Sequence, residues 1–374
     1  MRTIITPSEQ RQRLISGFSA LLRVDTKLFV LVMIVTIIGL ITIYSNSGGD
    51  TGLVVKQIVR ILIGMTVMVF LTQIHPDTFR LFAPILYFLT ILLLILVVFF
   101  GVGKTAGRWL DLYIIRFQPS ELMKIFVPLM LAWYYSDKPL PPRFIYLVIG
   151  SIFVVIPMLL IIKQPDLGTA LLIGMSGAVA ILLVGMSWRF FIGATVSLAG
   201  LIPLLWINLH DYQKQRLLTF FNPESDPLGS GYHLMQSKIA LGSGGIFGKG
   251  FLSGTQSKLE FLPEHSTDFI FSAFGEEFGF LGTLILMFLY LFIALRGLGI
   301  SIKATDNFAR ILSGTISLTI FLYVIVNVGM VIGLLPVVGA PLPFMSYGGT
   351  SMVTLFASLG IIMSIKSHQR ILRK

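Results

Sequence analysis

Long apolar runs separated by short polar breaks dominate the chain. A helix that crosses a lipid bilayer needs about 20 mostly apolar residues, and ten runs reach or approach that length. They cover residues 28–45, 54–73, 80–101, 118–135, 144–163, 167–186, 189–208, 268–295, 310–334 and 347–366. The fourth run is the weakest, because it carries Glu121 and Lys124. The pattern predicts an all-α integral membrane protein with about ten transmembrane helices.

Composition agrees with this pattern. The 374 residues are 55% hydrophobic and 12% charged, with a mean hydropathy of +0.89, whereas about 25% of the residues of soluble domains are charged. We therefore expect a single polytopic membrane domain over residues 1–374 rather than several soluble domains. The first apolar run has the length of a span rather than that of a cleavable signal.

The distribution of lysine and arginine predicts the orientation, because cytoplasmic segments of membrane proteins carry an excess of them. Both ends of the chain are basic, so both termini are predicted to be cytoplasmic, which requires an even number of spans. Residues 209–267 then form one long extracytoplasmic loop, while the other links are short. Its glycine, proline and aromatic residues and its direct entry into the eighth run favour an ordered lid.

Charge and cysteine content narrow the function. The net charge of +11 is explained by orientation and by contacts with anionic headgroups, so no nucleic acid partner is expected. The chain has no cysteine and five scattered histidines, which excludes thiol chemistry and gives no metal-ligand spacing. Charges of both signs gather on the outward-facing segments, which predicts a binding site on the outer side.

The first polar cluster opens the fourth run. Pro119 suits the first turn of a helix, with Glu121 at the positive end of its dipole. Glu121 and Lys124 share one helix face and can pair. The pair is either a structural link between helices or part of a polar cavity, and the cost of charge at membrane depth favours the cavity. Further candidates in this cluster are Arg108, Arg116, Gln118 and Ser120.

Two further groups lie along the outer side. The tight turn at residues 163–169 contains Lys163 and Asp166; such turns are common for structural reasons alone, but Lys163 can also face an anionic group. In the long loop, Arg216 and Lys249 stand near glycine-rich turns, whose backbone amides can cradle phosphate. Glycine-rich loops are more often merely flexible, and the spacing is not that of a nucleotide P-loop.

The sharpest candidate lies where the long loop enters the eighth run. Asp268 stands at this boundary, and Glu276 follows two helical turns later. At 100° per residue the two differ by about 80° around a helix, so Glu276 is predicted to share a cavity with Asp268. A carboxylate at this place can act as a general base. The alternative is a helix cap, for which aspartate is a favoured residue.

Residues 333–351 are rich in proline and glycine and contain no charge. Irregular backbone at membrane depth is tolerated where it lines a cavity or is buried in protein. We therefore expect this segment, which contains Ser346, to form a wall of the site rather than to supply its chemistry.

Taken together, residues 107–124, 164–169, 211–250, 260–280 and 335–351 resemble the shape, elongation, division and sporulation (SEDS) family of cell-wall glycosyltransferases. The resemblance runs from about the first span to the C-terminus, and several long motifs in one order are highly specific. Within the family, the short soluble tails are more similar to the elongation member than to its division relative.

The resemblance implies an activity and a setting. The activity is peptidoglycan synthesis during cell elongation: lipid II is polymerised into β-1,4-linked glycan strands, with release of undecaprenyl pyrophosphate. The catalytic aspartate falls on Asp268, and Glu121 and Lys124 are implied to be functionally sensitive. The setting is the bacterial inner membrane with the active site facing the periplasm. The implied partners are a class B penicillin-binding protein transpeptidase and other membrane proteins of the elongation complex.

The residues suit this reaction. An α-linked diphosphate donor that gives a β linkage requires inversion, hence one displacement with one base and no covalent intermediate. Asp268 would be that base. The leaving pyrophosphate needs positive charge, and a divalent cation, Mg²⁺ or Mn²⁺, is expected with unassigned ligands. The candidates for binding substrate or pyrophosphate are Arg108, Arg116, Glu121, Lys124, Lys163, Arg216 and Lys249. Supporting roles are expected for Gln118, Ser120, Asp166, Glu276 and Ser346.

Two other functions are compatible with a polytopic membrane protein. A lipid II flippase would also have intramembrane charge and broken helices, but it should carry polar residues along the whole path, whereas the polar clusters here lie on the outer side. A non-catalytic scaffold for a transpeptidase would tolerate the loss of Asp268.

Overall fold

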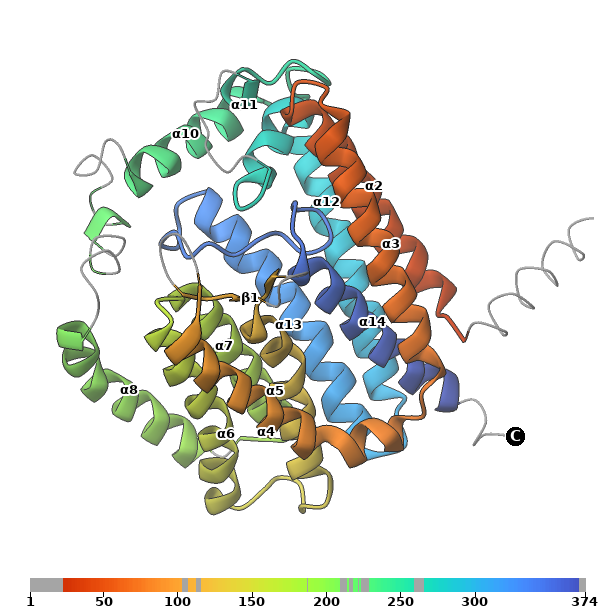
Figure 1. Cartoon of the computed structure of the whole chain (residues 1–374), viewed down its shortest axis with the longest axis vertical. Helices are drawn as coiled ribbons and strands as arrows, with labels where there is room; N and C mark the ends of the chain where they lie inside the picture. The colour runs from red at the N-terminus through yellow and green to blue at the C-terminus, as the bar shows by residue number, and fades with distance from the viewer. Residues whose placement is uncertain are drawn as a thin grey trace, which may run out of the picture.

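The structure is a computed structural model that describes residues 23–102, 107–111, 116–186, 188–208, 214, 218–220, 222, 229–258 and 266–369. Each of the ten apolar runs contains a helix, and Figure 1 shows these helices gathered into one bundle with α8 at its edge. They are α2 (Thr26–Asn46), α3 (Thr51–Gln73), α4 (Pro76–Phe100), α5 (Pro119–Ser136), α6 (Phe144–Lys163), α7 (Leu167–Leu183), α8 (Trp188–Asn208), α12 (Ile270–Ile302), α13 (Asn307–Val331) and α14 (Thr350–Gln369).

Among the described residues, seven of these helices are long and apolar enough to cross a membrane by length and composition. Helix α7 is apolar but has only 17 residues, and α5 is interrupted by the charges of Glu121 and Lys124. The prediction of an all-α, multi-pass membrane protein is therefore confirmed. The count of ten spans and the cytoplasmic position of both termini stay predictions.

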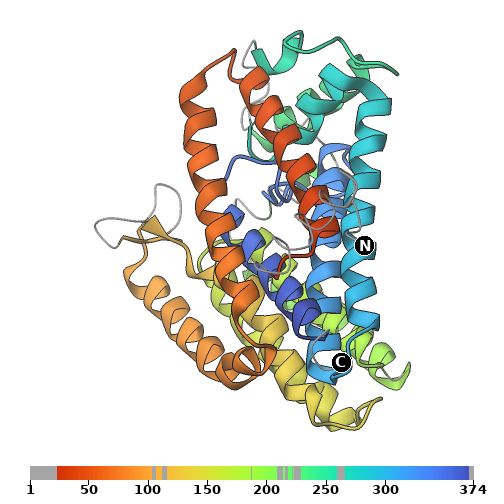
Figure 2. The same ribbon diagram turned by 90° about the vertical axis from the view of Figure 1, so that its right-hand side faces the viewer.

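The described part of the long loop is partly helical. It contains α10 (Ser230–Ser243) and α11 (Thr255–Lys258), and α10 packs against α12 and α13. Both views place α10 and α11 at the end of the bundle where α2 passes into α3 (Figures 1 and 2). There the Leu252 amide donates to Ser45 Oγ at 3.1 Å. A short antiparallel hairpin, β1 (Leu110–Asp111) and β2 (Arg116–Phe117), leads into α5.

Close helix packing depends on small residues. A Cβ atom added at Gly64 would lie 2.7 Å from the Phe356 ring, and one at Gly360 would lie 2.6 Å from the Met68 carbonyl oxygen. These glycines let α3 and α14 approach along their length, as small residues do in membrane proteins. Helix α13 packs on α5, α7, α12 and α14 and is mostly buried, so it is a central element of the bundle.

A charged cluster ties the first described span to two of the last three. The Asp25 carboxylate caps α2 by accepting from the Leu28 amide at 2.8 Å. It also accepts from Arg296 of α12 at 2.7 Å and contacts the ammonium group of Lys366 of α14. Asp25 is buried, and removing one partner from a buried ion pair is strongly destabilising. The cluster therefore holds three helices in register.

Candidate active site

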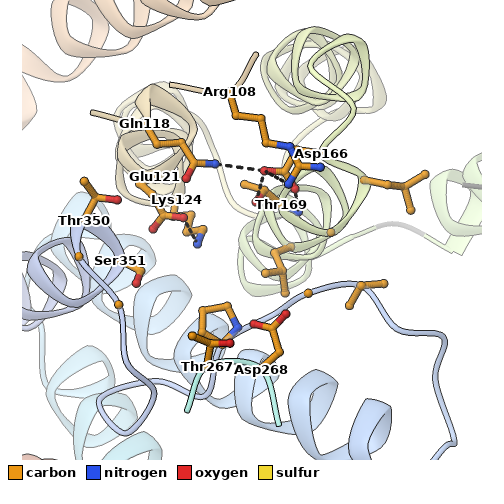
Figure 3. A pocket seen from close by; sticks show the side chains of 18 of the residues that line it. Arg108, Gln118, Glu121, Lys124, Asp166, Thr169, Thr267, Asp268, Thr350 and Ser351 are labelled. Atoms are coloured by element: carbon orange, nitrogen blue, oxygen red, sulfur yellow. Dashed lines mark hydrogen bonds and ion pairs between the residues drawn. The ribbon is translucent and has the colours of Figure 1, made fainter. Parts of the chain in front are cut away.

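A cavity of about 590 Å³ opens where the β1–β2 hairpin, the first turns of α5, α7 and α14, and residues 336–349 meet. Figure 3 shows its polar side chains from close by. They are Arg108, Gln118, Glu121, Lys124, Asp166, Thr169, Thr267, Asp268, Thr350 and Ser351. Residues far apart in the sequence thus converge on one polar chamber, and most of the predicted outer clusters contribute to it.

Three helices begin at this cavity. Helix α5 starts at Pro119, α7 at Leu167 and α14 at Thr350, and residues of each first turn line the chamber. The prediction that Pro119 opens a helix is confirmed. A helix N-terminus carries unpaired amide groups and the positive end of the helix dipole, and it favours anions such as phosphate. The three helix starts therefore place partial positive charge at the cavity, beside the Arg108 and Lys124 side chains.

Glu121 and Lys124 form the predicted pair on one face of α5. Lys124 Nζ donates to Glu121 Oε1 at 2.6 Å, and both side chains are largely buried. The ammonium group also lies 5.6 Å from the centre of the Tyr323 ring on α13, a cation–π distance. Glu121 accepts a long hydrogen bond of 3.4 Å from Thr354 of α14. The pair joins α5 to α13 and α14 and lines the cavity, so it combines both roles considered from the sequence.

Asp166 organises the neighbouring wall. Its carboxylate caps α7 by accepting from the Thr169 amide at 3.2 Å and from the Thr169 hydroxyl at 3.0 Å. Gln118 donates to the same carboxylate at 3.1 Å, and Arg108 lies 3.9 Å from it. Arg108 also donates to the Pro165 carbonyl. These contacts fix the hairpin to the start of α7 and hold the Arg108 guanidinium at the edge of the cavity.

Asp268 lies on the opposite side of the cavity from the Glu121–Lys124 pair and from Asp166 (Figure 3). It lies in the turn formed by residues 266–269 and is partly exposed. Helix α12 begins at Ile270, with Phe269 at the cap position and no side-chain cap bond. The structure therefore does not give Asp268 the capping role considered from the sequence. A Cβ atom at Gly339 would lie 3.3 Å from its carboxylate, so the glycine keeps this wall open.

The uncharged segment 333–351 holds the Asp268 turn in place, as a wall of the cavity should. Ser346 Oγ donates to the Thr267 carbonyl at 2.6 Å and accepts from the Leu342 amide at 2.8 Å. The Tyr347 amide donates to the Ser266 carbonyl at 2.8 Å. Ser346 therefore acts through the backbone of the turn rather than lining the chamber.

The prediction that Glu276 shares a cavity with Asp268 is wrong. Glu276 is fully buried, accepts from Lys249 Nζ at 2.6 Å and from the Thr255 amide at 2.9 Å, and does not line the chamber. The angular estimate fails because residues 266–269 form a turn, so the helical repeat does not extend back to Asp268. Lys249, expected at pyrophosphate, is instead the partner of this buried carboxylate.

The contacts of Glu276 join the glycine-rich stretch of the loop to α12 beside a kink in that helix. Gly279 has a φ of 67° within the helix, and the Gly248 amide lies 2.3 Å from the position of its missing Cβ. The Lys249 and Gly250 amides donate to the Glu276 and Glu277 carbonyls, each at 3.0 Å. Glycine is needed here because only glycine combines this φ with so close an approach. The glycine-rich stretch of the loop is thus docked on α12.

Glu276→Ala is expected to lower the free energy of unfolding by about 2 kcal/mol, because it leaves Lys249 and two backbone donors without their acceptor. Thermal unfolding in detergent measures the loss. Glu276→Gln is the matched control, since it keeps the size of the side chain and one acceptor oxygen, and it should cost less. Equal unfolding temperatures for wild type and Glu276→Ala would contradict this account.

Two of the remaining candidates, Lys163 and Ser120, do not line the cavity. Lys163 is exposed at the end of α6 and does not line it. Ser120 is buried in the first turn of α5 behind the lining residues. The Arg116 backbone pairs with Asp111 in the hairpin, but its side chain lies outside the described part of the structure, as does all of Arg216.

Sequence reasoning missed polar groups inside the apolar runs. On α3, Gln57 donates to the Ser346 carbonyl at 3.2 Å and the Arg60 guanidinium lies 4.3 Å from the centre of the Tyr347 ring. On α13, Tyr323 supports Lys124. The signal was present, because a polar residue in a spanning helix faces the bundle interior or a cavity.

Comparison with known proteins gives consistent matches over almost the whole chain. The FtsW/RodA/SpoVE family, described as cell cycle protein, matches residues 25–371. The chain is 47% identical over 352 residues to peptidoglycan glycosyltransferase MrdB of Escherichia coli K12, covering 94% of this chain and 95% of that one. It is 33% identical to a probable peptidoglycan glycosyltransferase FtsW of Geobacter metallireducens, covering 93% and 96%.

Solved structures share the fold. The crystal structure of the rod shape determining protein RodA of Thermus thermophilus superposes with a TM-score of 0.70 at 26% identity, covering 92% of this chain and 96% of that one. A chain from a structure described as the coordination of polymerization and crosslinking by a peptidoglycan synthase complex gives a TM-score of 0.80 at 28% identity, covering 92% and 98%.

Proposed function

This chain belongs to the FtsW/RodA/SpoVE family and is a peptidoglycan glycosyltransferase, and from that premise we propose that it polymerises lipid II in the cavity around Asp268. The observation that carries the proposal is the arrangement across the chamber. Asp268 stands on one side, and Lys124, Arg108 and three helix N-termini stand on the other. One carboxylate opposite a surface suited to diphosphate is what an inverting transfer from a lipid diphosphate needs.

In the proposed reaction, Asp268 and the cationic side of the cavity act on different bonds of the substrates. Asp268 accepts the proton of the acceptor sugar hydroxyl, whose oxygen attacks the anomeric carbon of the donor. The bond from that carbon to the diphosphate oxygen breaks as the new glycosidic bond forms, and the electron pair leaves with undecaprenyl pyrophosphate. Lys124, Arg108 and the positive ends of the α5 and α14 dipoles stabilise the negative charge that develops there.

A divalent cation in this cavity would need the substrate for part of its coordination. Asp166 and Glu121 are engaged by Thr169, Gln118 and Lys124, and the described residues contain no group of three or more acidic, histidine or cysteine side chains that could hold a metal. Mg²⁺ is commonly held by one or two carboxylates together with substrate phosphates. A Mg²⁺ or Mn²⁺ ion would therefore be held by the diphosphate together with one or two carboxylates of the cavity, and would neutralise charge on the leaving group.

The same premise sets the cellular context that we propose. The protein lies in the bacterial inner membrane with the cavity facing the periplasm, an orientation that the basic ends of the chain support. It works with a class B penicillin-binding protein that cross-links the new strands, and with other membrane proteins of the elongation complex. A solved structure with the same fold comes from a peptidoglycan synthase complex, which supports this partnership.

The test is polymer formation by purified wild-type protein, alone and with its transpeptidase, from lipid II in the presence of Mg²⁺, Mn²⁺ or a chelator. Glycan strands and released undecaprenyl pyrophosphate are expected, with less product when the metal is removed. The absence of polymer in every condition, together with movement of lipid II across liposome membranes, would support the flippase instead. The absence of both would leave a scaffold for the transpeptidase.

A further inference from the structure

We propose that Asn327 of α13 is a positioning residue that fixes the backbone at Asp268, an inference that rests on the proposed function of this site. Asn327 is fully buried. Its amide nitrogen donates to the Asp268 carbonyl at 2.8 Å and to the Ala340 carbonyl at 2.6 Å. One side chain thus joins the turn that carries Asp268 to the proline-rich wall of the cavity.

The orientation of this amide follows from its partners. Both neighbours of the nitrogen are carbonyl oxygens, which only accept hydrogen bonds, so the nitrogen and not the oxygen of the side chain must face them. The Asn327 oxygen is buried and has no hydrogen-bond partner in the described structure. A buried polar atom without a partner is costly, and the two bonds made by the nitrogen offset that cost.

Helix α13 also supports the group across the cavity. Tyr323 lies one helical turn before Asn327, so the two side chains point to the same face. The Tyr323 ring lies against Lys124 at 5.6 Å, while Asn327 holds the Asp268 backbone. One rigid helix therefore sets the position of the Asp268 turn relative to the Glu121–Lys124 pair. Their separation decides whether acceptor hydroxyl and diphosphate meet their partners at the same time.

Loss of the two Asn327 hydrogen bonds should affect the position of Asp268 more than the stability of the fold. The neighbouring residues of the turn stay attached through Ser346 Oγ to the Thr267 carbonyl and through the Tyr347 amide to the Ser266 carbonyl. The peptide groups that lose a hydrogen bond are those of Asp268 and Ala340. A displacement of about 1 Å at a catalytic group can lower the rate on the order of 100-fold, so the effect should fall on kcat.

The test uses the full chain with its transpeptidase and lipid II as substrate. Asn327→Leu removes both donors at similar volume and is expected to lower kcat roughly 10- to 100-fold, with KM little changed. The two carbonyls left without their donor should also lower the unfolding temperature, so kcat is compared per folded protein. Asn327→Gln keeps two donors on a longer arm and should fall between Leu and wild type. Thr319→Val is the matched control, because it removes a buried hydrogen bond to Ser176 from the same helix without touching the Asp268 turn.

Wild-type kcat in Asn327→Leu would overturn the proposal. So would a loss of activity that only follows the loss of folded protein, or an increase in KM at unchanged kcat. If the leucine variant does not fold, Asn327→Gln decides: reduced kcat at unchanged KM supports positioning, and loss in proportion to the folded fraction refutes it. Failure of wild type to polymerise lipid II would instead reject the proposed function itself.

Discussion

Asp268→Asn is expected to abolish detectable glycan polymer from lipid II, with a loss of the order of 10²- to 10⁴-fold. The substitution preserves the size of the side chain and removes the carboxylate that would accept the proton of the attacking hydroxyl. Folding should survive, because the turn is held by its backbone, through the Thr267 carbonyl and the Asn327 amide. Polymer length and amount, measured with the transpeptidase present, give the result directly.

Asp306→Asn is the matched control for this experiment. Asp306 caps α13 by accepting from the Ala309 amide at 3.4 Å and does not line the cavity. Asparagine caps helices about as well as aspartate, so this variant should keep wild-type activity. Equal polymer from Asp268→Asn and wild type would remove Asp268 from the chemistry and leave it a structural residue of the cavity wall.

The second large effect concerns the buried pair on α5. Glu121→Gln and Lys124→Met each leave one charge buried without its partner, which costs about 3–5 kcal/mol of stability. Both single variants should therefore unfold at lower temperature and lose polymerase activity. The double variant Glu121→Gln, Lys124→Met contains neither charge, so it should recover most of the stability.

Activity should separate from stability in that double variant. Lys124 is proposed to stabilise the leaving diphosphate, so a well-folded protein that lacks it should remain inactive. Thermal unfolding and polymer formation measured on all four proteins complete a double-mutant cycle. A stable and active double variant would show that the pair only links helices, which is the structural alternative that the sequence left open.

The apolar pattern predicted the fold well because lipid imposes a simple rule. Backbone groups must be satisfied within each span, so length and hydropathy locate helices with little help from tertiary contacts. All ten predicted runs contain helices, even α5, whose two charges weaken its signal. Pro119 also marked a helix start correctly, since its role is local.

Tertiary arrangement explains what the sequence could not predict. The Glu276 prediction assumed a continuous helix from Asp268, but α12 begins at Ile270. Lys249 and Glu276 meet because a glycine-rich loop docks on the kink at Gly279, a contact between segments that sequence spacing cannot reveal. The sequence analysis did not single out Asn327 or Gln57. Their hydrogen-bond partners are backbone carbonyls of irregular segments, and the sequence does not show where such carbonyls lie.

The Asp25 cluster bears on how the protein is made. Ribosomes deliver the spans in order, yet the carboxylate at the head of α2 finds its cationic partners only on α12 and α14. Helix α2 thus cannot complete these contacts until α12 and α14 have been made. Assembly of this part of the bundle therefore ends with a late step in which α12 and α14 close on the start of α2.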